Sequence, residues 1–406
     1  MRILFVVTGS QPTYFSVAPL ATAARNAGHQ VMLAAHEPWV KTAESIGLPT
    51  FCYATEPIRK FMGLPDTRDD ALRLPPTPPD EQMLGQGRGF ARMGRAGLEP
   101  LLELADDWAP DVVVGSALCF GAMLLTARLK LPYVRHIENQ IPVARTDVGA
   151  AAELRADLER LGLDGLPQPD LILDATPPSL RPSDAPGPAQ PLRWIPSNPQ
   201  RRLERWVYNR PEGRRRVLIT SGSRSLMFHD QGWGMPQLVG ELTGMGVDVL
   251  IAASPGNREL TAHQIPDRIS VAERFGQDMG DVRVGWIPMD AVAPTCDLAV
   301  NHGGATTVLT LLAGGVPQLI IPEGKPDYHR DAVAQSLSDF GAGRSLWPQA
   351  EGEAAGREPG EVIAAACRDM LAEPGYTERA HLLAKEIAAQ PTPAEVVPML
   401  EALISR

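Results

Sequence analysis

The sequence is poor in cysteine, with four among 406 residues. These stand far apart, at positions 52, 119, 296 and 367, and no two of them have the short spacing of a zinc-binding pair. A disulfide framework is also excluded, because such frameworks need a dense set of cysteines in a small chain. This usage fits a reducing compartment, and we expect the protein in the cytoplasm.

Long apolar runs are missing as well. The first apolar run, residues 3–7, is much shorter than the roughly 20 residues that cross a bilayer. It leads directly into Gly9-Ser10 rather than into a signal-peptide cleavage pattern. We therefore expect no membrane span and interpret the run as a buried first strand.

The third missing feature is an excess of positive charge. Lys and Arg number 38 against 48 Asp and Glu, which gives a net charge of −10. Binding to nucleic-acid phosphates depends on clustered Lys and Arg, so a nucleic-acid partner is not expected. The segment 9–13 also lacks the G-x-G-x-x-G pattern, which argues against a dinucleotide-dependent dehydrogenase.

What the sequence does have is an alternation of short apolar runs with helical patterns. Residues 2–7 and 31–35 flank a helical pattern that ends at Gly28, and 111–115 and 132–134 are further apolar runs. Runs of this kind predict parallel strands that are covered by helices on both faces. The first half is therefore expected to be an α/β domain with a doubly wound sheet.

The second half repeats this alternation, with apolar runs at 216–220, 248–253, 282–284, 298–300 and 318–321. A chain of this length exceeds the size at which one core keeps growing, so two Rossmann-like domains are expected. Ligands of open parallel sheets bind beyond the carboxyl ends of the strands. We therefore expect the binding cleft between the two domains.

Two irregular stretches interrupt the alternation. Residues 55–97 are rich in Pro, Gly and Arg and predict a long loop of the kind that forms a lid or a binding wall. The Pro-rich stretch 177–211 predicts the domain boundary. The expected parts are an N-terminal domain at 1–196, a linker at 197–214, a C-terminal domain at 215–375, and a helix at 376–406 that returns toward the N-terminal domain.

A glycine-rich segment, Asn301-His302-Gly303-Gly304-Ala305-Thr306-Thr307, follows the apolar run at 298–300. An apolar helical pattern begins just past its glycines, so the free N–H groups of a helix start should lie there. Such a start binds anions, and the glycines would let a diphosphate approach without a Cβ in the way. His302 could donate a hydrogen bond to a phosphate oxygen, or it could be a structural cap.

A second loop of this type, Ser221-Gly222-Ser223, follows the run at 216–220. Its donors could converge with those of the first loop on one polyphosphate, or the loop could simply turn the chain. No carboxylate cluster with metal-ligand spacing stands near either loop. We therefore expect neither a metal nor a cofactor, with the helix start and His302 offsetting the phosphate charge.

Residues 285–343 resemble the donor-binding block of inverting glycosyltransferases with the GT-B fold, especially those that modify antibiotics. The resemblance is carried by the order and spacing of Trp-x-Pro, Cys-Asp-Leu, His-Gly-Gly and Ala-Gly-Gly-Val-Pro-Gln, and it extends over most of the chain. Within this group the chain is most similar to the urdamycin-type deoxysugar C-glycosyltransferases of aromatic polyketides. The resemblance implies two Rossmann-like domains that face each other across a cleft, the acceptor in the N-terminal one and the nucleotide sugar in the C-terminal one.

The resemblance also implies which residues bind the donor, a dTDP-deoxysugar that serves as co-substrate. Trp286, Ile287 and Pro288 would flank the base, and Glu323, Gly324 and Asp327 would face the sugar. The diphosphate would be held by Ser221, Gly222, Ser223, His302, Gly303, Gly304, Ala305 and Thr306. Lys325 and Tyr328 replace an Asp-Gln pair of relatives that use fully hydroxylated sugars, which fits a deoxysugar.

The acceptor side departs from the family pattern. Many O-glycosylating relatives carry a His in the loop after the first strand, where it deprotonates the acceptor hydroxyl. Thr13 stands at that position here and cannot act as a base near neutral pH. Either another group takes the proton or the acceptor is already acidic, as a polyphenol would be. The expected acceptor-binding residues are Gly9, Ser10, Thr13, Tyr14, His136 and Asn139.

The segment after the run at 132–134 could supply that other group. His136 or Glu138 could reach an acceptor there, or each could lie in a solvated loop. Asn139 stands at what looks like a relative's aspartate position and cannot act as a base. We favour Glu138 as the catalytic base, with His302 as the other catalytic residue.

The sequence thus predicts an inverting, metal-independent transfer of a deoxysugar from dTDP-sugar to an aromatic polyketide in antibiotic biosynthesis. The missing His favours C-glycosylation over O-glycosylation of a phenol or alcohol. Two other functions are weighed, an inactive accessory protein for a partner transferase and a nucleotide-sugar epimerase of the same fold. The oligomeric state, including a homodimer, stays open.

Overall fold

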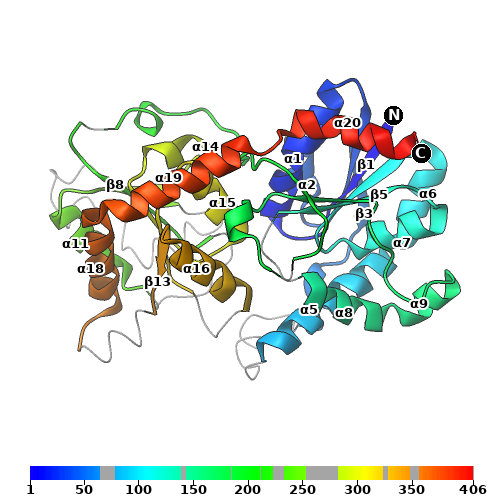
Figure 1. Cartoon of the computed structure of the whole chain (residues 1–406), viewed down its shortest axis with the longest axis horizontal. Coiled ribbons are helices and arrows are strands. Elements are labelled where there is room, and N and C mark those ends of the chain that lie inside the picture. The colour runs from blue at the N-terminus through cyan, green and yellow to red at the C-terminus, as the bar shows by residue number, and fades with distance from the viewer. Residues whose placement is uncertain are drawn as a thin grey trace. The chain divides into compact units, whose positions relative to one another are not determined.

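The structure is a computed structural model, and it describes residues 1–64, 78–138, 143–183, 185–210, 212–222, 233–252, 282–322, 328–347 and 356–405. The chain divides into two compact units, Met1–Pro199 with Ala389–Arg406, and Gln200–Ala388. Both units are drawn in Figure 1. The chain therefore leaves the first unit at residue 199 and returns to it at residue 389.

The first unit is built on a sheet of parallel strands, which are β1 (Arg2–Val6), β2 (Gln30–His36), β3 (Thr50–Ala54), β4 (Val112–Ser116), β5 (Tyr133–Ile137), β6 (Leu171–Asp174) and β7 (Gln190–Pro191). Their order across the sheet is β3-β2-β1-β4-β5-β6-β7. The strands form from continuous apolar runs because both faces of the sheet are covered. The order reverses between β1 and β4, which makes this the switch point of the first sheet.

Helices cover both faces of this sheet. One face carries α1 (Gln11–Asn26), α2 (Val40–Ser45) and α20 (Pro393–Ile404), which share an apolar cluster with β1. Figure 1 shows α20 beside α1, although the two are far apart in the sequence. The other face carries α5 (Pro79–Ala96), α6 (Leu98–Trp108), α7 (Phe120–Leu129), α8 (Val143–Glu153) and α9 (Arg155–Arg160).

The segment 55–97 is mostly helical where the structure describes it, in α5 and the short α3 (Ile58–Phe61), so the expectation of a long loop was wrong there. The glycines that suggested a loop are points of close helix packing. A Cβ on Gly87 would collide with the Thr146 carbonyl in α8, and one on Gly94 would lie 2.5 Å from the backbone of Gly121 in α7. Tertiary packing of this kind offsets the roughly 1 kcal/mol by which a glycine weakens a helix.

The second unit is built on a second parallel sheet, whose strands are β8 (Arg216–Thr220), β9 (Asp248–Ala252), β10 (Val282–Gly285), β11 (Leu298–Asn301), β12 (Gln318–Ile320) and β13 (Gly343–Ser345). Their order is β10-β9-β8-β11-β12-β13. It reverses between β8 and β11, which is the same place in the pattern as in the first unit. Each sheet therefore has one switch point, where ligands bind in folds of this type.

The helices of the second unit also cover both faces. One face carries α11 (Met235–Gly244) and α18 (Pro359–Ala372), and the other carries α14 (Met289–Val292) and α15 (Ala305–Ala313). α16 (Tyr328–Phe340) precedes β13, and α19 (Pro374–Ala389) follows α18. The expected terminal helix at 376–406 is two helices here, of which α20 belongs to the first unit. Among the described helices, none has the length and apolarity needed to cross a bilayer.

Candidate functional site

The two predicted phosphate loops flank the switch point of the second sheet. The loop at 221–222 follows β8, and the loop at 302–304 follows β11, the strand beside it. Thr220 pairs with Asn301 in the register, so the two strands end level with each other. The fold therefore brings together two polar loops that are far apart in the sequence.

The imidazole of His302 lies between glycines from both loops. A Cβ on Gly304 would come within 2.5 Å of His302 Nε2, and a Cβ on Gly222 would come within 2.7 Å of the same atom. Gly222 also has a φ of +75°, a backbone conformation that favours glycine. Both glycines therefore make room for the ring, which is half-buried where the sequence predicts a phosphate ligand.

The helix start beyond His302 offers further donors. α15 begins at Ala305, and its N-cap residue Gly304 supplies no side-chain cap. The first N–H groups of a helix have no partner inside the helix, and no bond from those of 305–307 is seen to the rest of the described residues, so they can donate to a ligand. The N–H of Gly303 is not among them, because it donates to Asn301 Oδ1 at 2.8 Å. Gly303 instead forms the turn, with a φ of +80°.

Ser221 adds a hydroxyl to the same edge. Its side chain is 5% exposed, and among the described residues nothing forms a hydrogen bond with its Oγ. A buried hydroxyl of this kind is costly unless a ligand pairs with it, and a phosphate oxygen would do so. Five other residues singled out at the donor lie outside the described residues, namely Ser223, Glu323, Gly324, Lys325 and Asp327.

The predicted base-binding segment follows β10. Ile287 is buried in the apolar cluster with α14 and α15. Pro288 after it is also buried, whereas Trp286 is half-buried. The guanidinium of Arg201 lies 5.2 Å from the centre of the Trp286 ring. One face of that ring is therefore already covered by a cation, a contact that the sequence did not indicate.

In the first unit, two of the expected acceptor residues, Gly9 and Ser10, lie in the loop after β1, whereas Thr13, which was expected in that loop, lies in the first turn of α1; all three are half-buried. Gly9 has a φ of +145°, and a Cβ there would lie 2.6 Å from Thr13 Oγ1. The Thr13 side chain thus packs directly over the Gly9 backbone. Only glycine fits this turn without strain.

Tyr14, also expected at the acceptor, lies instead in the core. Its side chain is fully buried. The hydroxyl donates to the Val7 carbonyl and accepts from the His36 N–H, both at 3.2 Å. Burial raises the pKa of Tyr14 well above its usual value. Tyr14 therefore packs in the core rather than facing an acceptor, and its hydrogen bonds link the start of the loop after β1 to the end of β2.

His36, at the end of β2, holds the same loop, a role that sequence reasoning missed. Its Nδ1 lies 2.9 Å from the Glu37 carbonyl oxygen and its Nε2 lies 2.9 Å from the Gly9 carbonyl oxygen. Burial nevertheless lowers the pKa of His36. No sequence signal marks this contact, because it depends on how β1 and β2 pair.

Glu138 directly follows the end of β5, and His136 lies in the strand two residues before it. They are 4% and 1% exposed, and His136 Nδ1 is 3.8 Å from Glu138 Oε2. Within the described part of the chain, Glu138 Oε2 and both His136 nitrogens have no hydrogen-bond partner. Exceptions of this kind mark places where a ligand or water supplies the partner. Asn139 lies outside the described residues.

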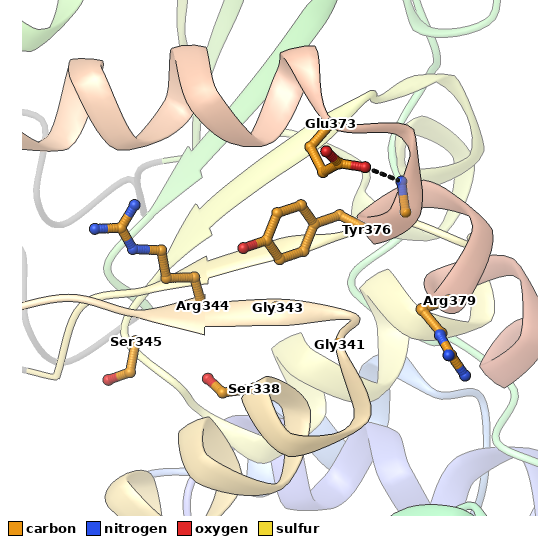
Figure 2. Close-up of a pocket in the computed structure, with 9 residues that line it drawn as sticks. Ser338, Gly341, Gly343, Arg344, Ser345, Glu373, Tyr376 and Arg379 are labelled. Atoms are coloured by element: carbon orange, nitrogen blue, oxygen red, sulfur yellow. Dashed lines mark hydrogen bonds between the residues drawn. The ribbon is translucent and has the colours of Figure 1, made fainter.

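A pocket of about 570 Å³ lies beside the edge strand β13, between α16 and α19 (Figure 2). Its charges are largely matched within the protein. Arg344 lies 4.0 Å from Asp369, and Glu373 accepts from the Gly375 N–H at 3.2 Å. Among the predicted donor residues that the structure describes, none lines this pocket. Among the described residues, no group of His, Cys, Asp and Glu side chains is placed so that it could bind a metal ion.

Comparison with known proteins identifies the class. Among solved structures, the spinosyn rhamnosyltransferase SpnG is 28% identical, with a TM-score of 0.81 over 99% of this chain and all of that one. The glycosyltransferase SsfS6 of Streptomyces sp. SF2575, complexed with thymidine diphosphate, is 26% identical, with a TM-score of 0.78 over 99% of both chains. The protein is thus a glycosyltransferase with the GT-B fold, which confirms the expected α/β architecture of two Rossmann-like domains.

The family follows from the sequence matches. Residues 22–222 match the N-terminal domain and residues 237–403 the C-terminal domain of the erythromycin biosynthesis protein CIII-like family. The L-demethylnoviosyl transferase of Streptomyces niveus is 30% identical over 99% of this chain and 98% of its own length. The chain belongs to this family of antibiotic glycosyltransferases. The narrower likeness to urdamycin-type C-glycosyltransferases stays a prediction.

Proposed function

We propose that the protein transfers a deoxysugar from a dTDP-sugar, bound by the second unit, to an aromatic polyketide, bound by the first. The donor assignment rests on the open helix start of α15 together with His302 and the buried Ser221 hydroxyl. The relatives support it. SsfS6 and SpnG are both known in complex with thymidine diphosphate. Another relative is named as an aclacinomycin-T 2-deoxy-L-fucose transferase.

The residues of the donor loops assist departure of the diphosphate. Negative charge grows on the phosphate oxygen as the bond between the anomeric carbon and that oxygen breaks. His302 donates a hydrogen bond to the diphosphate, and the N–H groups and dipole of α15 stabilise its charge. Because these donors stabilise the charge that a divalent cation would otherwise neutralise, transfer should proceed unchanged in EDTA. A requirement for added Mg²⁺ would contradict this role.

The acceptor assignment rests on the buried carboxylate of Glu138. A phenolic O–H is a donor that would pair with Glu138 Oε2, and the carboxylate would take its proton. Thr13, in the first turn of α1, cannot do this. The resulting phenolate activates the ring carbons ortho and para to its oxygen. One of these carbons attacks the anomeric carbon from the face opposite the diphosphate, and its ring proton then leaves to restore the aromatic ring.

O-glycosylation is the second candidate, because a phenolate is nucleophilic at its oxygen as well as at its ring carbons. The same phenolate would attack through its oxygen instead of a ring carbon. Incubation of the purified protein with dTDP-deoxysugars and a panel of polyphenols would decide between the two. A C-glycoside survives acid hydrolysis and shows a carbon-bound anomeric carbon by NMR, whereas an O-glycoside releases its sugar. Release of the sugar in acid would overturn C-glycosylation.

Changing Glu138→Gln tests the base. The amide keeps the shape of the side chain but cannot accept the phenolic proton, so kcat should fall by about 10²–10⁴-fold. Binding of dTDP, measured by calorimetry, should not change. Glu103→Gln is the matched control, because Glu103 is an exposed glutamate of α6 in the same unit. Equal turnover in the two variants would remove Glu138 from the mechanism.

A further inference from the structure

Asn301 and Gln318 form a buried amide relay behind the donor loop. Both side chains are fully buried, at the end of β11 and the start of β12. The Gly303 N–H donates to Asn301 Oδ1 at 2.8 Å, and Asn301 Nδ2 donates to Gln318 Oε1 at 2.9 Å. Gln318 Nε2 then donates to the Val308 carbonyl oxygen at 3.1 Å. The relay thus ties the glycine turn to the first turns of α15.

The two ends of the relay fix its direction. Gly303 offers an N–H, so Asn301 must present its oxygen there and its NH₂ group to Gln318. Val308 offers a carbonyl, so Gln318 must present its NH₂ group there. Turning over either amide alone would place a donor against a donor or an acceptor against an acceptor. In a buried site such a mismatch is costly, so the two amides hold one arrangement.

This arrangement bears on the parts that meet the phosphate. His302 stands between Asn301 and Gly303 in the chain, so both of its backbone neighbours are held by the relay. The Val308 N–H also donates to the Gly304 carbonyl at 2.9 Å, which closes the first turn of α15. The free N–H groups of 305–307 are carried by that same turn. Loss of the relay would therefore let the imidazole and the helix start move relative to each other.

We propose that Gln318 is a positioning residue for the donor diphosphate, although it touches no ligand. Acting through Asn301, it holds the Gly303 turn so that His302 and the start of α15 face the same phosphate group. This inference rests on the proposed function. Gln318 itself belongs to the Ala-Gly-Gly-Val-Pro-Gln motif, whose glutamine thereby gains a physical role.

The variant Gln318→Glu makes the relay depend on pH. A protonated carboxyl can donate its O–H to the Val308 carbonyl and accept from Asn301 Nδ2, which reproduces the glutamine pattern. An ionised carboxylate has no donor for Val308, so the relay breaks. Burial raises the pKa of a carboxyl, which brings this change into the range that can be measured. Calorimetry at pH 5 to 8.5 should give a dTDP Kd near that of the wild type at low pH and about tenfold weaker at high pH.

Two further variants separate positioning from general destabilisation. Gln318→Met lacks the relay at every pH and should bind dTDP about tenfold more weakly throughout. Gln390→Met removes another buried glutamine, which donates to the Thr176 carbonyl at 3.2 Å in the first unit. It should lower the melting temperature but leave the dTDP Kd unchanged. The proposal would be overturned if Gln390→Met weakened dTDP binding as much as Gln318→Met does. It would also be overturned if the dTDP Kd of Gln318→Glu, divided by that of the wild type, did not change with pH.

Hydrogen exchange without ligand distinguishes this inference from the donor assignment. In Gln318→Glu, the peptide covering 301–308 should exchange as in the wild type at low pH and faster than the wild type at high pH. If the wild type binds no dTDP, the donor assignment would be overturned whatever the exchange shows, and the relay would have no donor diphosphate to position. If the wild type binds dTDP but Gln318→Glu and the wild type show equal exchange at every pH, the relay alone would be overturned.

Discussion

The two switch points share a topology but differ in what occupies them. In the first unit, the edge between β1 and β4 is filled by the protein's own polar side chains. The Thr8 N–H donates to Ser116 Oγ at 3.0 Å, and Thr8 Oγ1 lies 2.7 Å from the Tyr53 hydroxyl and 3.3 Å from Cys119 Sγ. Burial raises the pKa of Cys119 to about 11, so its thiol stays neutral within this network.

In the second unit, the corresponding edge carries glycines, one imidazole and a helix start. His302 lies between Gly222 and Gly304, and the Ser221 hydroxyl has no partner among the described residues. The first turn of the following helix also differs. The second residue of α1 is a proline, which has no N–H to donate, whereas the first turn of α15 contains no proline. The same strand order thus supports a loop in the first unit and, in the proposed function, binds the donor diphosphate in the second.

The largest expected effect is that of His302→Ala. Without the imidazole, the charge of the departing diphosphate loses one donor, and kcat should fall by about 10²–10³-fold. Circular dichroism and the melting temperature should not change, because the ring lies in a half-buried gap between glycines. His36→Ala, the matching change in the first unit, should instead lower the melting temperature and leave dTDP binding intact. Wild-type turnover in His302→Ala would end the catalytic assignment.

Gly304→Ala should act through the same imidazole. Its φ of −67° suits alanine, so the backbone is not strained. The added methyl would meet His302 Nε2 and push the ring from its place. We expect kcat to fall by at least about tenfold, and the double variant with His302→Ala to be no slower than His302→Ala alone, because coupled residues are not additive. Fully additive losses would show that Gly304 acts independently of the ring.

The first unit should show a pH dependence that comes from His36. Burial holds its pKa below the usual value, so the unfolded chain takes up a proton at a higher pH than the folded one. Stability is therefore complete above about pH 6.5 and falls on acidification by up to about 1.4 kcal/mol per pH unit, until the folded pKa is reached. His36→Gln should flatten this slope in urea unfolding at pH 5 to 8. Parallel slopes for the two proteins would contradict it.

The features that could be predicted from the sequence are those that depend on neighbouring residues in the chain, as the donor loops of the second unit do. The strands buried on both faces are continuous apolar runs, so β1, β2, β4, β8 and β11 could be predicted. The helix start at Ala305 follows from local signals, namely two glycines and then an apolar helical pattern. These features depend on residues near each other in the chain.

What depends on distant residues could not be predicted in this way. β13 has only three residues, and β3 is mostly half-buried, so neither stands out in the sequence as a buried strand. The glycines of α5 resemble loop glycines until α8 is placed against them. The roles of His36 and Gln318 arise only when β2 lies beside β1 and β12 beside β11. Side chains at the acceptor are therefore harder to predict than backbone groups at the donor.

The smallest expected effect concerns the helix with which the chain returns to the first unit. Thr392 and Glu395 form a capping box at the start of α20, in which Thr392 Oγ1 accepts from the Glu395 N–H at 3.2 Å and Glu395 Oε2 accepts from the Thr392 N–H at 2.7 Å. Thr392→Ala should lower the melting temperature by about 2–4 °C, with unchanged kcat, because α20 packs on α1 within the first unit.

Ser405→Ala, at the other end of α20, is the matched control, because its hydroxyl makes one exposed bond of 3.3 Å to the Glu401 carbonyl. It should leave the melting temperature unchanged. The Thr392 N–H and hydroxyl both donate to the Glu395 carboxylate and hold its pKa below the usual value of 4.5. Alanine keeps the N–H but removes the hydroxyl, so the bond from the hydroxyl, which the wild type alone has, is present above that pH and is lost as the pH falls through the folded pKa. The difference between Thr392→Ala and the wild type should therefore shrink near pH 3. A constant difference would show that the bond from the Thr392 hydroxyl to the carboxylate contributes nothing to the cap. A loss of dTDP binding in Thr392→Ala would show that the donor loops depend on the cap of α20.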